Sequence, residues 1–189
     1  MKSSLKMLAL IPLLFVANIA NAQTKLTAKS ASVVIHGNST MHEWSSNVTK
    51  VSVTGDFDFS NGIIEKVNHA TVKMESKSIK STKDSDLMDD RTHSTLKAAK
   101  FPTITYECTN TVSAEHGTLK VNGNLTLAGV TKPIDLTMKV TTLANGDIEL
   151  KGSRKILMSS FGIKPPSFML GTLNVDDAVT IAFNIVLKK

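Results

Sequence analysis

The segment that decides the fold is Ala178–Lys188, with the sequence AVTIAFNIVLK. Successive side chains of a strand point to opposite faces of a sheet, so a period of two in hydrophobicity marks a strand with one buried face. In this segment all but one of the large apolar residues share one parity, and the polar residues fall on the other. The apolar row is Val179, Ile181, Phe183, Ile185 and Leu187, and the polar positions are Thr180, Asn184 and Lys188. The segment therefore predicts a strand that packs against a core on one side.

The same alternation recurs along the chain and predicts eight strands. Their expected bounds are Lys25–His36, Val48–Phe59, Ile64–Glu75, Phe101–Thr109, Thr118–Leu127, Pro133–Thr142, Ile148–Met158 and Ala178–Lys188. The connections are short, and Asn61-Gly62 and Asn145-Gly146 carry a dipeptide typical of tight hairpin turns. Since short connections join antiparallel neighbours, we predict an antiparallel sheet.

One segment between the strands lacks this alternation and predicts a helix over residues 85–99. Acidic residues gather at its start and lysines at its end, an order that complements the helix dipole. Its expected apolar stripe consists of Leu87, Met88, Leu96 and Ala99. The spacing of the acidic residues does not match a calcium-binding EF-hand loop, so helix-start electrostatics is the better interpretation. These residues are Asp84, Asp86, Asp89 and Asp90.

A sheet of eight antiparallel strands with one apolar face is typical of an up-and-down barrel. In an outer-membrane barrel the apolar face meets lipid between two girdles of aromatic residues. The whole chain has one Trp, one Tyr and seven Phe, too few for two girdles. We therefore predict an all-β, eight-stranded, lipocalin-like barrel whose apolar face points inward.

The first 22 residues have the composition of a signal peptide. Lys2 and Lys6 precede an apolar run, and Ala20-Asn21-Ala22 matches the small-x-small cleavage pattern. We expect cleavage after Ala22, which leaves one domain over residues 23–189 without a transmembrane segment. The expected location is the periplasm, with the extracellular space as the alternative.

Composition argues against several kinds of site. The net charge of +6 falls to +4 without Lys2 and Lys6 of the predicted signal peptide, and the remaining lysines are spread along the polar faces of the strands. Few aromatic residues are present to stack bases, so we expect no nucleic-acid partner. Cys108, the single cysteine, shares a strand face with Ile104 and Tyr106 and is expected to be a buried, inert thiol. The five histidines have no zinc-site spacing, and no catalytic grouping stands out. The sequence therefore predicts no enzyme, metal or cofactor.

Two features of the sequence leave it undecided whether the interior is packed or hollow. Three inward positions near mid-strand are Gly55, Gly123 and Gly152, which mark either bends of a small barrel or volume for a guest. The long connection over residues 159–177 is rich in apolar residues, so it packs on something rather than being disordered. It either caps a barrel end or forms part of a ligand entrance.

Six segments resemble the YceI-like family of exported, lipocalin-like proteins. They are Ser39–Trp44 (STMHEW), Ser78–Ser81 (SIKS), Leu96–Thr105 (LKAAKFPTIT), Gly123–Pro133 (GNLTLAGVTKP), Phe161–Ile163 (FGI) and Val175–Ile181 (VDDAVTI). The resemblance covers nearly all of the chain after residue 22. It implies an eight-stranded barrel with a helical segment and an internal tunnel for a polyisoprenoid chain, including isoprenoid quinones. Family members carry an Arg and an acidic residue just before the Phe-Gly-Ile, where this chain has Met158 and Ser160.

These observations predict a lumen that binds an apolar chain. The residues expected to line the lumen and its entrance are Trp44, Phe57, Met74, Tyr106, Leu125, Met138, Phe161, Ile163, Phe168, Ile181 and Phe183. His42 is the polar candidate at the rim, either as a ligand contact or as a residue that pins the loop. The expected partner is a lipid or isoprenoid ligand, and a homodimer is compatible with the sequence. The alternatives are a filled barrel that acts as an envelope scaffold or stress protein and, less favoured, an enzyme acting on a bound lipid.

Overall fold

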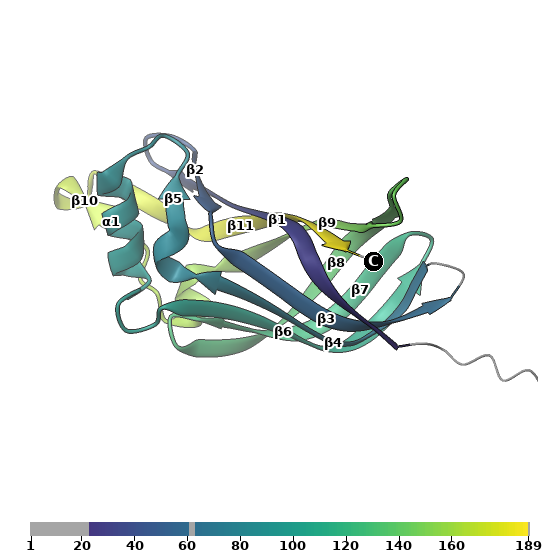
Figure 1. Cartoon of the computed structure of the whole chain (residues 1–189). Helices are drawn as coiled ribbons and strands as arrows, with labels where there is room; N and C mark the ends of the chain where they lie inside the picture. Colours follow the sequence, from purple (N-terminus) through teal and green to yellow (C-terminus); the bar gives the residue numbers. More distant parts are fainter. Residues whose placement is uncertain (1–22, 61–62, 189) are drawn as a thin grey trace, which may run out of the picture.

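The computed structural model describes residues 23–60 and 63–188. The predicted signal peptide and the Asn61-Gly62 turn lie outside these residues. The described chain forms a closed antiparallel barrel with one α-helix at one end (Figure 1). The predicted fold class is therefore confirmed.

Eight of the described strands form the barrel wall. They are β1 (Gln23–Ser39), β3 (Val51–Ser60), β4 (Ile63–Glu75), β6 (Thr103–Glu115), β7 (Thr118–Leu127), β8 (Val130–Thr142), β9 (Ile148–Leu157) and β11 (Leu173–Lys188). Around the wall the order is β1-β3-β4-β6-β7-β8-β9-β11, and the pairing of β11 with β1 closes the ring. Every pairing in the ring is antiparallel, as the short connections predict.

Two short strands extend the wall at the helix end of the barrel. β2 (Trp44–Val48) pairs with β1, and β5 (Ile79–Ser81) pairs with β2. The prediction of one strand over Val48–Phe59 was wrong at its start, because Val48 ends β2 and β3 begins at Val51. β2 and β5 were not predicted, since five and three residues are too few to show a clear alternation.

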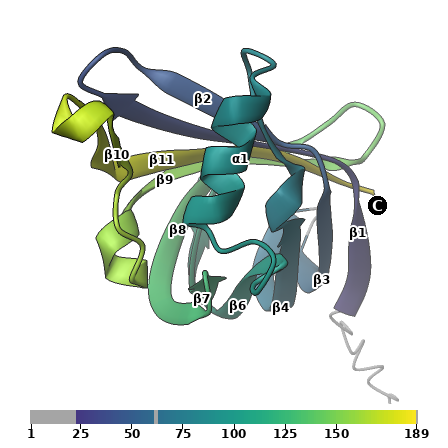
Figure 2. The ribbon, with the colours of Figure 1, turned by 90° about the vertical axis from the view of Figure 1, so that its left-hand side faces the viewer.

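The helix α1 (Asp86–Thr95) lies across the same end (Figure 2). It is shorter than the predicted helix over residues 85–99. Ser85 caps its start by accepting a hydrogen bond from the backbone N–H of Met88. The helix ends early because Lys97 adopts a left-handed backbone conformation, with φ of 52°, and the chain continues in turns to Lys100.

The connection over residues 159–177 contains short ordered elements. They are the 3-10 helix η2 (Met158–Phe161), the two-residue strand β10 (Ser167–Phe168) and the 3-10 turn η3 (Met169–Gly171). A further 3-10 turn, η1 (Ser76–Ser78), joins β4 to β5. The side chains of Ser159 and Asp177 hydrogen-bond each other and so tie η2 to β11.

The apolar rows point into the barrel and form its core. Leu119, Val121, Leu125 and Leu127 of β7 are all buried, and so are Val179, Ile185 and Leu187 of β11. Residues of the opposite parity are half-buried or exposed, and Lys120 and Asn122 of β7 are exposed. Alternation along each strand therefore separates the interior from the outer surface.

Candidate ligand-binding cavity

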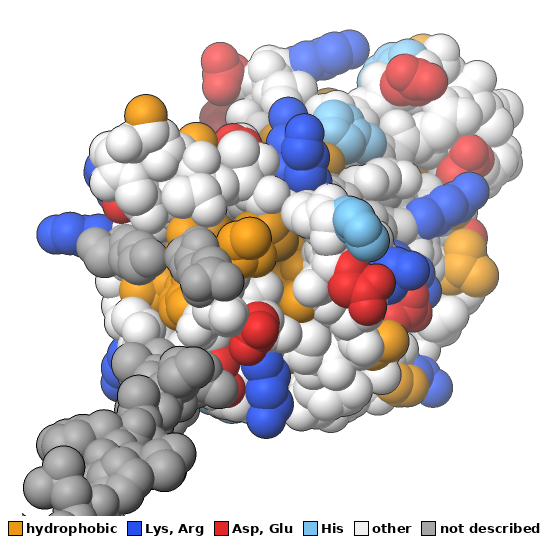
Figure 3. Space-filling view, turned by 90° about the vertical axis from the view of Figure 1, so that its right-hand side faces the viewer, with side chains coloured by type: hydrophobic (Ala, Val, Ile, Leu, Met, Phe, Trp, Pro, Cys, Tyr) orange, Lys and Arg blue, Asp and Glu red, His pale blue; other side chains and the backbone are white. Residues whose placement is uncertain are grey.

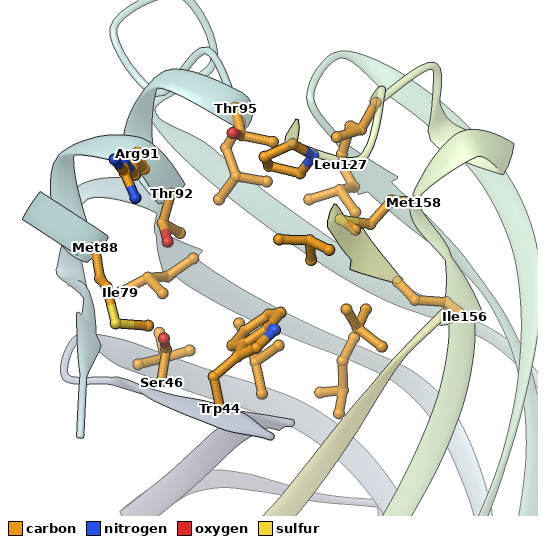
Figure 4. Close-up of a pocket in the computed structure, with 18 of the residues that line it drawn as sticks. Trp44, Ser46, Ile79, Met88, Arg91, Thr92, Thr95, Leu127, Ile156 and Met158 are labelled. Atoms are coloured by element: carbon orange, nitrogen blue, oxygen red, sulfur yellow. The ribbon is translucent and has the colours of Figure 1, made fainter. Parts of the chain in front are cut away.

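A cavity of about 270 Å³ lies inside the barrel at the end covered by α1. We refer to it as the helix-end cavity. Figure 4 shows side chains of α1 on one side, Trp44 and Ser46 of β2 below them, and Ile156 and Met158 on the facing wall. Most of the residues that line it are apolar, and β1, β7, β9 and β11 contribute several of them.

One face of α1 forms the roof of this cavity. Met88, Arg91, Thr92 and Thr95 recur at helical spacing and all line it. The predicted apolar stripe on this helix was wrong at two positions, because Leu87 and Ala99 are exposed. Met88 and Leu96 do face the cavity.

The adjacent face of α1 is attached to β5 by polar contacts. Asp89 is only 5% exposed, and its Oδ1 accepts the backbone N–H of Ser81 at 2.6 Å while its Oδ2 lies 2.9 Å from Nζ of Lys80. Nε2 of His93 lies 2.9 Å from the carbonyl oxygen of Ile79. The roof is thus held to the wall by hydrogen bonds and one ion pair.

These contacts determine how Asp89 titrates. Burial acts to raise its pKa, but the Ser81 N–H and the Lys80 ammonium group together hold the pKa below its ordinary value. The same carboxylate raises the pKa of Lys80. Asp89 was predicted as part of the helix-start charge, and it serves in addition as the buried anchor between α1 and β5.

The loop between β1 and β2 forms part of the cavity rim. Trp44 packs over Gly37 of the neighbouring strand, and its Nε1 donates a hydrogen bond to the carbonyl oxygen of Asn38 at 3.2 Å. His42 lines the cavity too, with Nδ1 2.8 Å from the carbonyl oxygen of Glu43. Its backbone N–H and C=O both bond Ser39, so His42 also pins the loop.

The connection over residues 159–177 both fills the core and lines the cavity. Phe161 is only 2% exposed and belongs to the core, whereas Ile163 and Phe168 line the helix-end cavity. The guanidinium carbon of Arg91 lies 3.9 Å from the centre of the Phe168 ring, a cation–π contact that links α1 to β10. Both predicted roles of this connection therefore apply, each to different residues. Phe161 packs in the core as a structural residue, and Ile163 and Phe168 line the cavity that a ligand would enter.

A second cavity of about 120 Å³ lies deeper in the barrel, and we refer to it as the mid-barrel cavity. Phe57, Tyr106, Met138 and Phe183 contribute to its wall. Three of these rings each cover one of the inward glycines: Phe57 covers Gly55, Tyr106 covers Gly123 and Phe183 covers Gly152. The volume that the glycines leave is thus occupied by aromatic rings of the protein itself.

The two cavities share one wall. Val33, Met74, Leu125, Ile156 and Ile181 line both of them. These five residues are apolar and come from five different strands of the barrel. The two spaces are therefore neighbours inside the barrel, separated only by hydrocarbon side chains.

The charged side chain of Arg154 lies beside the mid-barrel cavity, at a gap in the strand pairing of the wall. β8 pairs with β9 only over Met138–Thr142 and Ile148–Gly152, and beyond that point the two strands have no ladder contacts. Arg154 of β9 lines the cavity and forms a bidentate ion pair with Asp135 of β8, with both N–O distances at 2.9 Å. This ion pair spans the part of the wall that lacks strand pairing.

Two titratable groups face the mid-barrel cavity. Burial raises the pKa of Tyr106, whose hydroxyl donates a hydrogen bond to the carbonyl oxygen of Ile134 at 3.2 Å. Burial also raises the pKa of the Cys108 thiol, which favours the unreactive protonated form. Cys108 is buried, as the sequence predicts.

The predicted lining residues divide between the two cavities. Trp44, His42, Ile163 and Phe168 line the helix-end cavity alone, whereas Phe57, Tyr106, Met138 and Phe183 line the mid-barrel cavity alone. Met74, Leu125 and Ile181 line both, and Phe161 lines neither. Sequence reasoning missed Arg91, Thr92 and Thr95, although their helical spacing with Met88 is visible in the sequence.

Two kinds of feature are absent from residues 23–60 and 63–188. No group of three or more His, Cys, Asp or Glu side chains within them is placed to hold a metal ion. No helix in this part of the chain has the length and hydrophobicity needed to cross a membrane.

A model of the YceI-like domain matches residues 18–187 of the chain. The chain belongs to the YceI-like family. The resemblance seen in the sequence is thereby confirmed. Several of the quoted family segments have structural roles here: Trp44 covers Gly37, Phe101 covers Gly129, and Gly162 adopts a left-handed conformation at the end of η2.

Curated relatives match over part of their length. Protein YceI of Salmonella arizonae is 34% identical over 119 residues, which are 63% of this chain and 59% of that protein. A UPF0312 protein of Pseudomonas aeruginosa is 38% identical over 76 residues, which are 36% of this chain and 38% of that protein. The chain therefore aligns with well under two thirds of either relative.

Solved structures share the fold at low sequence identity. BcnA of Burkholderia cenocepacia has a TM-score of 0.69 at 18% identity, covering 82% of this chain and 95% of BcnA. A polyisoprenoid-binding domain from Saccharophagus degradans, implicated in plant cell wall breakdown, has a TM-score of 0.66 at 15% identity, covering 88% of this chain and 99% of that domain. The YceI protein of Campylobacter jejuni has a TM-score of 0.60 at 22% identity, covering 76% and 84%.

Proposed function

We propose that this protein is an exported carrier or reservoir that holds the apolar chain of a polyisoprenoid, an isoprenoid quinone or a related lipid inside its barrel. The observation that carries this proposal is the pair of neighbouring cavities with a shared hydrocarbon wall. A long, thin apolar chain fits such a space better than a compact polar molecule. Family membership supports the same ligand class, since one structural neighbour is named as a polyisoprenoid-binding domain.

The energetics of this proposal require no precisely placed polar group. Burying one methylene contributes about 0.8 kcal/mol, so ten buried methylenes contribute roughly 8 kcal/mol before the costs of binding. A free energy of this size corresponds to a dissociation constant of about 1 µM. The leucine, isoleucine, valine and methionine side chains of the shared wall supply the contact.

The proposed role is binding rather than chemistry. The residues that face the two cavities are mainly hydrocarbon, and two of the polar ones bond to the protein itself: His42 to its own loop and Tyr106 to Ile134. The proposed location is the periplasm, which follows from the signal peptide predicted over residues 1–22. A carrier in that compartment would keep a lipid tail away from water between membranes.

Native mass spectrometry of the protein purified gently from its own cells tests the proposal. The expected result is a one-to-one adduct with the mass of a prenyl lipid. Thr95→Phe, which places a ring in the helix-end cavity, should remove the adduct. Ser94→Phe is the matched control, because Ser94 is the exposed neighbour on the same helix, and it should keep the adduct.

An empty protein that also takes up no added prenyl quinone would contradict the proposal. That outcome would favour the filled-barrel scaffold. Turnover of a bound lipid that disappears on changing His42 or Glu43 would instead indicate an enzyme.

A further inference from the structure

Four exposed apolar side chains lie on the segments that surround the helix-end cavity. Met41 is in the loop between β1 and β2, Leu87 is in the first turn of α1, and Met169 and Leu170 form η3. Met41 is 68% exposed, Met169 is 71% exposed and Leu170 is fully exposed. Figure 2 shows that α1, β2 and β10 all lie at this end of the barrel.

Hydrogen bonds hold these segments together. The backbone N–H of Thr40 donates to the carbonyl oxygen of Asn174 at 3.0 Å, and the Thr40 hydroxyl donates to the carbonyl oxygen of Thr172 at 3.1 Å. These bonds place the Met41 loop beside η3. The contact of Arg91 with Phe168 links η3 to α1, since Phe168 directly precedes Met169. The exposed side chains therefore belong to one connected surface.

The backbone of η3 is strained, and hydrogen bonds from Thr172 and Asn174 to the carbonyl oxygens of Met169 and Gly171 hold it in this conformation. Met169 and Leu170 both have positive φ, at 52° and 54°, a region that disfavours residues with a side chain and is better tolerated by glycine and asparagine. The strained residues are also the most exposed large apolar residues in the described chain. Such a tip has no stabilising role in water, so its apolar side chains point to a partner outside the protein.

We propose that Met41, Leu87, Met169 and Leu170 insert into the surface of a lipid bilayer, with the helix-end cavity facing the membrane. This proposal rests on the proposed function, because it supplies the route by which a lipid enters the barrel. Phe168, one residue from the inserted tip, lines the cavity. A lipid tail that leaves the bilayer at this point meets apolar side chains without crossing water.

The charged residues next to Leu87 indicate what kind of bilayer this surface recognises. Asp84, Asp86 and Asp90 are exposed in and just before α1, close to Leu87 in sequence. Lys83 and Arg91 lie among these carboxylates, so this segment carries no excess of positive charge that would attract anionic lipids. Insertion therefore depends on hydrophobic contact, and a zwitterionic bilayer is a sufficient partner.

The opposite end of the barrel provides an internal comparison. Ile63 and Val112 are each 57% exposed there, and charged side chains surround the apolar recess at that end (Figure 3). Neither residue borders the helix-end cavity. Val112 is therefore a matched control for the exposed residues of η3.

Sedimentation with vesicles of pure phosphatidylcholine tests the proposal. The protein should bind these vesicles, and Leu170→Asn should weaken binding about tenfold or more, since inserting a leucine contributes at least that factor. Asparagine tolerates positive φ, so Leu170→Asn should fold at least as stably as the unchanged protein. Val112→Asn should leave vesicle binding unchanged. Equal binding by Leu170→Asn, or equal loss in Val112→Asn, would overturn the proposal.

A fluorescent label reports which end is inserted. Cys108 is buried, so an environment-sensitive fluorophore can be attached selectively to Leu170→Cys or to Val112→Cys. Addition of vesicles should shift the emission of the label at position 170 to the blue and leave the label at position 112 unchanged. The reverse pattern would place the wrong end on the membrane.

Binding of a water-soluble, short-chain prenyl quinone separates this proposal from the proposed function. Leu170→Asn should bind that quinone as the unchanged protein does, because Leu170 does not line either cavity. Quinone binding without vesicle binding would overturn the docking surface alone. Vesicle binding without quinone binding would contradict the proposed ligand and leave the docking surface standing.

Discussion

The helix-end cavity and the mid-barrel cavity lie in one barrel but are bounded in different ways. Around the mid-barrel cavity the wall consists of barrel strands, and three aromatic rings sit on three glycines. The helix-end cavity is larger, and its roof is a helix held by hydrogen bonds and an ion pair to the three-residue strand β5. One region is bounded mainly by paired strands, with the Arg154–Asp135 ion pair across the unpaired stretch of β8 and β9, and the other is closed by a small number of polar contacts to a helix.

This difference indicates where the barrel can open. Separating barrel strands breaks many backbone hydrogen bonds at once, whereas lifting α1 breaks a small number of contacts, made by Met88, Asp89, Arg91 and His93. Local opening is therefore expected at the helix end. The mid-barrel region acts as the rigid part against which the roof moves.

The largest effect is expected where the two cavities meet. Leu125→Asp places a charge in the shared apolar wall and should prevent folding, because the arginines that line the two cavities are already engaged, Arg154 with Asp135 and Arg91 with Phe168. Asn122→Asp adds the same charge on the outer face of β7 and should fold normally. Circular dichroism and recovery of monomeric protein measure both outcomes. A native-like Leu125→Asp would show that this wall is not interior.

A smaller loss is expected from filling the space above a mid-barrel glycine. A Cβ added at Gly123 would meet the Tyr106 ring and would lie 2.6 Å from the carbonyl oxygen of Glu107, which cannot move freely. Gly123→Val should therefore lower the free energy of unfolding by about 3 kcal/mol. Gly146→Ala meets no atom within 4 Å and should cost only about 1 kcal/mol for its positive φ. Urea denaturation compares the two, and equal costs would contradict the close packing above Gly123.

At the helix end, removal of the buried anchor should loosen only the roof. Asp89→Ala leaves the backbone N–H of Ser81 without its partner and should cost about 1–3 kcal/mol. Hydrogen exchange should speed up in α1 and β5 and remain slow in β7. Asp90→Ala, an exposed neighbour on the same helix, should change neither quantity. Faster exchange throughout the barrel would contradict the separation between the two regions.

Lowering the pH should loosen the α1 roof in the same way as Asp89→Ala does. The pKa of Asp89 is held below its ordinary value of 3.8 in the folded protein. Its stabilising contribution is therefore present above pH 3.8 and is lost as the pH falls through the lower folded-state pKa. Hydrogen exchange in α1 should begin to accelerate below that ordinary value, and Asp89→Asn should remove this step. A step that persists in Asp89→Asn would assign the acid sensitivity to another group.

The smallest effect concerns the thiol of the mid-barrel cavity. Burial keeps Cys108 protonated, so alkylation by iodoacetamide near neutral pH should be slow in the folded protein and fast in denaturant. A prenyl quinone that reaches the mid-barrel cavity should slow the reaction further. Rates that do not change with the quinone would confine the ligand to the helix-end cavity.

Sequence patterns predicted the barrel wall because, in each long strand, the alternation of apolar and polar residues shows which face is buried. Leu119–Leu127 alternates strictly, and the structure places its apolar row inside. The helix was predicted from charge order and the absence of alternation, but its end was misplaced, because a left-handed residue such as Lys97 leaves no clear mark in sequence. β2 and β5 are stabilised by tertiary pairing alone, so they too escaped prediction.

The residues that line the cavities were predicted only in part, because parity identifies inward residues on the strands but not on the helix. Strand residues such as Leu125 and Ile181 could be assigned to the interior by parity. Arg91 and Thr95 face the cavity only because Asp89 and His93 bond the adjacent helix face to β5, a tertiary arrangement that sequence periodicity does not contain. The role of Gly123 was likewise open until its partner Tyr106 was known.

The most direct test of the central claim is a titration of Trp44 fluorescence with prenyl quinones of increasing chain length. Trp44, the single tryptophan, lines the helix-end cavity, so a quinone bound there should quench it. The account predicts an affinity that rises with each added isoprene unit until both cavities are filled and then stays constant. No quenching, or an affinity that does not depend on chain length, would contradict it.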